Sequence, residues 1–164
     1  MELTEEQSFH AFAAARHQAL LRTAYLLTSN HHDAEDLVQR ALMKAVPKWG
    51  SIRGNPEPYV RKILYNENVS RWRRYPKGER LVDMTPEVAS HDLDVSTREA
   101  VRDALTRLTV KQRTVLVLRY YEDLTEVQTA AALGISVGTV KSQTRHALDR
   151  IRVLAPDLAV ALQA

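Results

Sequence analysis

Along most of this 164-residue chain, apolar residues recur at spacings of three and four, which is the period of an amphipathic helix. Alternating runs of β-branched residues, the usual sign of strands, are absent, whereas Ala and Leu are abundant. The pattern therefore predicts an all-α protein. Helices are expected at about residues 5–27, 34–49, 59–74, 97–108, 110–121, 126–133 and 137–152.

The stretch from Leu124 to Arg152 has the pattern of a helix-turn-helix. Thr125, followed three residues later by Gln128, forms a capping box and predicts a helix that begins at Glu126. Gly134 is expected to end this helix, because only glycine takes a left-handed C-cap without steric cost. The residues expected on its buried face are Val127, Ala130 and Ala131.

The second helix of this pair, capped by Ser136, is expected to expose a basic patch. Lys141 and Arg145 lie four residues apart, and Ser142 and His146 share that spacing. A helix in the DNA major groove reads bases with such side chains, while further cations hold phosphates. The alternative is a solvated helix with ordinary surface charges, but the tight turn, the glycine and the basic face together favour DNA binding. The stripe expected to face the core is Val137, Val140, Thr144, Ala147, Leu148 and Ile151.

Further signals place the other helix ends. Asp33 or a neighbouring residue is expected to cap the second helix, and Pro58 suits the first position of the helix 59–74. Residues 115–118 are apolar nearly all round the helix, so the helix 110–121 is expected at the centre of its domain. The remaining capping boxes are Thr4 with Gln7, Ser96 with Glu99, and Thr109 with Gln112.

Residues 75–95 interrupt the helical pattern, because they contain Pro76, Gly78 and Pro86 and have no sustained periodicity. We interpret this segment as a flexible linker between two small helical domains. A frayed end is expected after Pro156, and a protease-recognition tag at residues 158–164 is the alternative. The expected boundaries are 4–75 for the first domain, 76–95 for the linker, 96–155 for the second domain and 156–164 for a tail.

Composition narrows the class of protein. The absence of Cys excludes disulfides and cysteine-ligated zinc and fits a reducing cytoplasm. No apolar run is long enough to span a membrane and no signal-peptide pattern opens the chain, so a cytoplasmic protein is expected. The formal net charge of +3 is mild, so the distribution of charge matters more than its total.

Two further clusters could carry chemistry. The helix 59–74 interleaves cations with aromatic residues, a combination that binds a nucleic-acid backbone and stacks on unpaired bases. A buried Trp72 and a solvated basic helix end are the alternative interpretation. The segment His31 to Asp36 is rich in possible metal ligands, but adjacent residues at a helix start diverge. We interpret its carboxylates as charges that complement the helix dipole, and an enzyme with a metal centre here is the least favoured hypothesis.

Segments 33–39 and 137–142 resemble the corresponding motifs of extracytoplasmic-function sigma factors, the small bacterial subunits that direct RNA polymerase to promoters. Segments 26–28, 119–124 and 138–143 resemble the SigE-like actinobacterial branch. The resemblance extends over nearly the whole chain. It implies a sigma2-like helical bundle and a sigma4-like helix-turn-helix domain, without catalysis or a cofactor. The implied partners are promoter DNA, the β′ clamp helices and β flap of core RNA polymerase, and, as a candidate regulator, an anti-sigma factor.

The resemblance also implies roles for single residues. Polymerase binding falls on Asp36, Gln39 and Arg40, although the family often has Glu at the last of these positions. The loop 52–58 and the helix after it match the element that captures the −10 promoter strand, with contacts from Arg61, Lys62, Asn66, Arg73 and Arg74. Recognition of the −35 duplex falls on Arg119, Lys141, Ser142, Arg145 and His146.

Two departures from the family pattern fall in the second domain. The family frequently has an arginine where this chain has His146. Thr129 replaces a usual isoleucine, and we expect its methyl group to pack and its hydroxyl to bond the preceding turn. The alternative function is a stand-alone helix-turn-helix regulator whose N-terminal domain senses a signal or dimerises.

Overall fold

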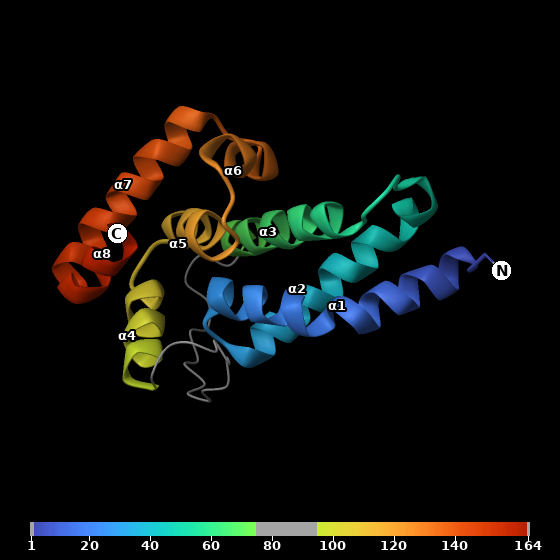
Figure 1. Cartoon of the computed structure of the whole chain (residues 1–164), viewed down its shortest axis with the longest axis horizontal. Helices are drawn as coiled ribbons and strands as arrows, with labels where there is room; N and C mark the ends of the chain where they lie inside the picture. Colours follow the sequence, from blue (N-terminus) through green and yellow to red (C-terminus); the bar gives the residue numbers. More distant parts are fainter. Residues whose placement is uncertain (1, 75–94, 164) are drawn as a thin grey trace. The chain divides into compact units, whose positions relative to one another are not determined.

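The computed structural model describes residues 2–74 and 95–163, and within these ranges the chain forms helices and turns and no strands (Figure 1). The described residues belong to two compact units. The prediction of an all-α protein with two small helical domains is therefore confirmed. The predicted linker lies outside the described residues except for Val95, and the domain boundaries stay a prediction. No helix in the described ranges has the length and apolar character needed to span a bilayer.

The first unit contains α1 (Glu5–Thr28), α2 (His31–Ala45), the 3₁₀ helix η1 (Val46–Ser51) and α3 (Glu57–Arg74). The predicted capping box opens α1: the Thr4 hydroxyl accepts from Gln7 N at 3.2 Å, and Thr4 N donates to the Gln7 side chain at 3.0 Å. Ser29 ends α1 with a left-handed φ of 56°. The predicted span of the first helix is thus confirmed to within a residue.

The cap of α2 differs from the prediction. Asn30, not Asp33, is the N-cap residue: its backbone is extended, and its side-chain oxygen accepts from Asp33 N at 2.9 Å. Helix α2 therefore begins at His31, and Asp33 supplies a negative charge in the first turn, where it complements the helix dipole. Pro47 at the start of η1 has no backbone N–H to continue the α-helix, so α2 ends at Ala45 rather than at Trp49.

Helix α2 lies at the centre of the first unit and packs against both α1 and α3 (Figure 1). One apolar face of α2 is buried along its length, and Trp49 closes one end of the core. The Trp49 ring meets the Phe9 ring edge-on, with their centroids 5.1 Å apart, and the centroid of the Phe12 ring lies 5.2 Å from that of Trp49. The α2 residues buried in this core are Ala34, Leu37, Val38, Ala41 and Ala45.

The second unit contains α4 (Val95–Thr106), α5 (Val110–Leu116), the π-helical turn η2 (Val117–Tyr121), α6 (Glu126–Leu133), α7 (Val137–Leu154) and α8 (Pro156–Gln163). As predicted, the apolar run Val115–Leu118 is buried at the centre, where α5 packs against α7. The capping box of Thr109 and Gln112 is confirmed, with both bonds at 3.2 Å.

The start predicted for α4 is wrong. This helix begins at Val95, so Ser96 lies within its first turn rather than at the cap, and it ends at Thr106. The buried guanidinium of Arg113 donates to Leu105 O at 2.8 Å and to Leu108 O at 3.3 Å. It thereby supplies hydrogen-bond donors to carbonyl groups at the C-terminal end of α4 and just after it. Arg113 thereby joins α4 to α5, a role that the sequence pattern did not reveal.

The helix-turn-helix is confirmed in α6 and α7. Gly134 takes the left-handed cap with φ 65°, and Ser136 Oγ accepts from Thr139 N at 3.1 Å to begin α7. The predicted buried face of α6 is only partly confirmed, however, because Ala130 is buried but Ala131 is exposed. Val127 is 67% exposed, and the residues facing the core are Thr129 and Ala130. An eight-residue helix has too few turns for spacing alone to fix its buried side.

The tail is helical and not frayed. Pro156 begins α8, which packs against α7 and buries Ala159. Proline suits this position because its missing N–H would have no partner in the first turn and its φ already fits a helix. Residues that were expected to form a tail thus include a helix that packs against the second unit.

Thr129 is fully buried, and its hydroxyl oxygen has no hydrogen-bond partner among the residues that the structure describes, contrary to the bond that we expected from it. Thr129→Val keeps the side-chain shape and removes this unpaired polar atom. We expect the variant to stabilise the second unit by about 1 kcal/mol or more. Amide hydrogen exchange of Val115–Leu118 in the full-length chain measures the change.

Thr129→Ser is the control, because it keeps the hydroxyl and loses the methyl group. This variant should destabilise the same amides by roughly 1 kcal/mol, as the loss of a buried methyl group does elsewhere. Faster exchange in the valine variant would show that the hydroxyl is satisfied in solution.

Candidate nucleic-acid and partner interfaces

The exposed side of α2 carries the three residues to which the sequence assigned polymerase binding. Gln39 and Arg40 are exposed, and Asp36 is half-buried with a side-chain exposure of 40%. Asp36 and Arg40 form an ion pair of 3.1 Å one turn apart. The opposite side of α2 is buried in the core, so this face is free to meet another molecule without disturbing the fold.

The acidic and histidine residues at the start of α2 do not gather around a common point. Asp33 pairs with Arg71 of α3 at 2.7 Å, and Glu35 pairs with His31 at 3.4 Å. Within residues 2–74 and 95–163, no group of His, Asp and Glu side chains has the arrangement of a metal site. The interpretation of these carboxylates as helix-start charges therefore suits the geometry better than the metal-centre hypothesis.

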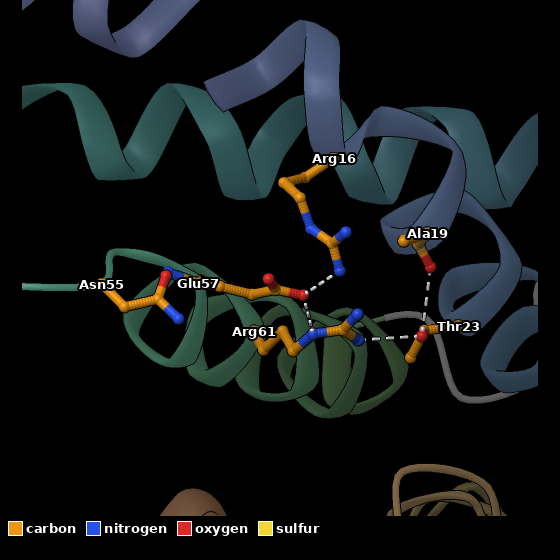
Figure 2. Close-up of polar contacts among 6 residues, drawn as sticks. All are labelled: Arg16, Ala19, Thr23, Asn55, Glu57 and Arg61. Atoms are coloured by element: carbon orange, nitrogen blue, oxygen red, sulfur yellow. Dashed lines mark hydrogen bonds and ion pairs between the residues drawn. The ribbon is translucent and has the colours of Figure 1, made fainter. Parts of the chain in front are cut away.

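The start of α3 is held by a partly buried network that the sequence pattern did not reveal. Glu57 Oε1 accepts from Arg16 Nη2 of α1 at 2.7 Å and from Arg61 Nε at 2.9 Å (Figure 2). The second arm of Arg61 donates to the Thr23 hydroxyl at 3.0 Å. Only the Glu57–Arg61 spacing was visible in the sequence, because Arg16 and Glu57 are 41 residues apart.

Burial alone would raise the pKa of Glu57, but the hydrogen bonds and positive charges of Arg16 and Arg61 outweigh it, and the pKa lies below its ordinary value of 4.5. The folded state thus binds this proton less readily than the unfolded chain. The resulting stability is present in full above the ordinary pKa and is lost as the pH falls through the lowered one.

We therefore expect Glu57→Gln to make the stability of the first unit less dependent on pH below about pH 4.5. Denaturant unfolding at a series of pH values, followed by the fluorescence of the buried Trp49, measures this dependence. A glutamine variant whose stability falls with acid as steeply as that of the parent would contradict it.

The cations that the resemblance assigned to capture of the −10 strand are not equivalent. Arg61, assigned to a phosphate, is committed to Glu57 and Thr23 with a side-chain exposure of 16%, so the structure gives it a role inside the protein. Lys62 is exposed, and so is Arg53 in the preceding loop, which has no ion-pair partner in the described part of the chain. Arg53 was missed as a single residue, although it lies in the predicted loop.

Three other residues assigned to capture of this strand lie on α3. The Asn66 amide nitrogen donates to Lys62 O at 2.8 Å, within its own helix. An incoming base would therefore replace a local bond of Asn66. Arg73 and Arg74 belong to the last turn of α3, and their side chains lie outside the described part of the structure.

On α7 the structure brings the predicted reading residues together. Lys141, Arg145 and His146 are exposed, and Ser142 is half-buried with its hydroxyl donating to Thr139 O at 3.1 Å. Lys141 Nζ lies 3.9 Å from Glu126 Oε2 at the start of α6. The outer face of α7 is thus basic in its N-terminal half, while Val140, Ala147 and Ile151 hold the helix against the core.

Arg119 has a different position from the α7 residues. It lies in the π-helical turn η2, and its guanidinium donates to Leu124 O in the segment that leads to α6. One arm of Arg119 therefore shapes the entry to the helix-turn-helix. The same segment contains Asp123 in a left-handed conformation with φ 55°.

Both units match known families. Residues 12–77 match the family described as Sigma-70 region 2, and residues 98–151 match the family described as Sigma-70, region 4. An RNA polymerase sigma-E factor of Streptomyces coelicolor is 36% identical over 160 residues, which cover 94% of this chain and 90% of that protein. The ECF RNA polymerase sigma factor SigM of Mycobacterium tuberculosis is 32% identical over 90% of this chain and 76% of its own length.

Solved structures agree with these matches. The sigma factor RpoE of Bartonella quintana, solved in complex with the anti-sigma factor NepR, has a TM-score of 0.73 and 30% identity, over 92% of this chain and 98% of that one. The protein CnrH, solved with the cytosolic domain of CnrY, has the same fold with a TM-score of 0.62 and 20% identity, over 91% of this chain and 88% of that one.

Proposed function

Because this chain belongs to the extracytoplasmic-function sigma factors, it is a promoter-specificity subunit of RNA polymerase, and we propose that its two units divide promoter recognition between them. Members of this family bind core RNA polymerase and promoter DNA and are not enzymes. The observation that carries the division of labour is the separation of two polar faces, one on α2 and α3 and the other on α7, onto units with cores of their own.

The first unit binds polymerase and the opened −10 strand in this proposal. Asp36, Gln39 and Arg40 dock on the β′ clamp helices, where the Asp36 carboxylate pairs with basic groups of the partner. Asn66 hydrogen-bonds an unpaired base. The cations that hold the strand are Arg53, Lys62, Arg73 and Arg74, while Arg61 is assigned to positioning.

The second unit reads the −35 element as duplex and docks near the β flap. The N-terminal half of α7 enters the major groove, so that Lys141 and Arg145 reach base edges or phosphates. Ser142 and His146 complete this face. Arg119 contributes by shaping the approach to α6, and the arm that it does not use there remains for a phosphate.

Promoter opening follows from this division. Unpaired bases gain contacts on the first unit that paired bases cannot make, which favours the melted state. Each unit alone makes few phosphate contacts, so the free protein should bind promoter DNA poorly. Because the protein acts with RNA polymerase on promoters of the chromosome, we infer that it is cytoplasmic. The complex of RpoE with NepR supports an anti-sigma factor as a regulatory partner of this chain as well.

A stand-alone helix-turn-helix regulator is not favoured, because the first unit matches Sigma-70 region 2 rather than a sensor or dimerisation domain. Reconstitution with core polymerase tests the function. Promoters selected from a randomised library should give transcripts with one start site, and scrambling either element should abolish them. Stable association with an active core that never initiates at a defined site would contradict the proposal, as would tight operator binding that does not need polymerase.

A further inference from the structure

We propose that Glu57 is a positioning residue for −10 strand capture: by joining Arg16 to Arg61 it fixes the start of α3, and the loop before it, against α1 before DNA arrives. The inference rests on the proposed function, because it assigns a role within the strand-capturing element named there. It concerns the network around Glu57 and not the residues that contact DNA.

The geometry ties two helices through a single oxygen atom. Figure 2 shows Glu57 Oε1 between the guanidinium of Arg16, from α1, and that of Arg61, one turn further along α3. Arg61 then reaches the hydroxyl of the fully buried Thr23, which itself donates to Ala19 O at 3.3 Å. The first two turns of α3 are thus bonded to α1 at two points.

This network supplies a link that apolar packing provides only weakly. Helix α2 packs extensively against both α1 and α3, whereas α1 and α3 have little direct contact with each other. The Glu57 side chain is 19% exposed, so its charged hydrogen bonds are screened less than those of a surface ion pair. Removing the carboxylate would leave two guanidinium groups side by side without the anion that holds them together.

The link extends into the loop. Asn55 Oδ1 accepts from Glu57 N at 3.0 Å, so the side chain of a loop residue is bonded to the residue at the centre of the network. Gly54 has φ +75°, a left-handed conformation that lets the chain turn just before this point. A fixed Glu57 therefore fixes the conformation in which Arg53 and Asn55 meet an incoming strand. Binding costs less when the site is preorganised in this way.

The face proposed to bind polymerase lets binding to core polymerase serve as an internal control for strand capture. Asp36 and Arg40 lie on α2 and pair with each other, whereas Glu57 pairs with Arg16 and Arg61 on α1 and α3. A positioning role therefore predicts that strand capture fails while polymerase binding persists. A general loss of stability predicts that both fall together.

The test measures both activities in the assembled holoenzyme. The probe is a labelled single-stranded oligonucleotide that carries the non-template −10 segment of a promoter selected with the parent holoenzyme. Glu57→Gln should weaken binding of this probe about tenfold and change the affinity for core polymerase by less than about twofold. Arg16→Met, which removes only the α1 arm, should act in the same direction with a smaller effect.

The direction of the change in DNA binding distinguishes a positioning role from a simple change in charge. Glu57→Gln removes a negative charge, which by electrostatics alone would strengthen binding to DNA. The control Glu67→Gln removes the same charge from the same helix and breaks the ion pair of Glu67 with Lys44, so it measures the electrostatic effect without disturbing the network. Glu67→Gln should leave binding of the probe unchanged or strengthen it.

Three results would overturn the inference: capture by Glu57→Gln at the parent level, loss of core binding in parallel with loss of capture, or an equal loss in Glu67→Gln. Should Glu57→Gln fail to fold, normal capture by Arg16→Met would overturn it as well. Failure of the parent holoenzyme to bind the probe is distinguishable from all of these, because it counts against the proposed function.

Discussion

Replacing Lys141 and Arg145 together with alanine is expected to abolish most transcription that depends on the −35 element. Both side chains lie on the exposed N-terminal half of α7, where a recognition helix meets base edges and phosphates. Each contact of this kind contributes about 1–3 kcal/mol, so the pair should reduce promoter affinity at least roughly tenfold. The measurement is transcription by the reconstituted holoenzyme over a range of salt concentrations.

The salt dependence of promoter binding and a matched control variant distinguish a direct contact with DNA from a change in net charge. If the two cations hold phosphates, their loss should also make promoter binding less sensitive to salt. Lys111→Ala removes a cation from an exposed site on α5 rather than α7 in the same unit, and should leave promoter binding nearly unchanged. Equal losses in Lys111→Ala and the α7 variant would show that α7 does not read DNA.

Asp36→Arg should remove binding to core polymerase while leaving the fold intact. The Asp36 carboxylate is exposed enough to reach a partner, and reversing its charge places two arginines one turn apart on the docking face. Losing one partner of a desolvated charge pair at an interface costs roughly 2–5 kcal/mol, so affinity for core should fall at least about thirtyfold. Competition against a labelled sigma factor for core polymerase gives this affinity.

Glu35→Arg is the matched control, because Glu35 is the neighbouring acid on α2 and its partner is His31. A residue next in sequence points to another side of the helix, so this reversal should leave core binding within about twofold of the parent. If Asp36→Arg competes for core polymerase as well as the parent protein does, Asp36 does not belong to the docking face.

Local signals predicted most of this fold. The capping boxes that begin at Thr4, Thr109 and Thr125 are confirmed, because each depends only on residues within one helical turn. The same signal failed at Ser96, where the chain is already helical from Val95. The turn at Gly134 was predictable because only one residue type takes that conformation without strain.

Contacts between distant segments were not predictable from spacing. Nothing in the sequence pattern joined Arg16 to Glu57, so Arg61 was assigned to DNA although its guanidinium is bonded within the unit. The buried face of α6 was partly misplaced for a related reason, since packing against α5 and α7 decides which side of so short a helix is covered. The basic exposed side of α7 was predictable, because Lys141 and Arg145 lie four residues apart on one helix, and its role in reading DNA stays a prediction.

If one unit meets opened −10 DNA while the other meets −35 duplex, site-directed DNA cleavage should map the two units to different parts of the promoter. The chain contains no cysteine, so a single one can carry an iron chelate that cuts nearby DNA. On promoter complexes of the holoenzyme, a probe at Ser142→Cys should cut around −35 and a probe at Lys62→Cys around −10. Cleavage of the same region from both positions, or the same cuts without core polymerase, would contradict the account.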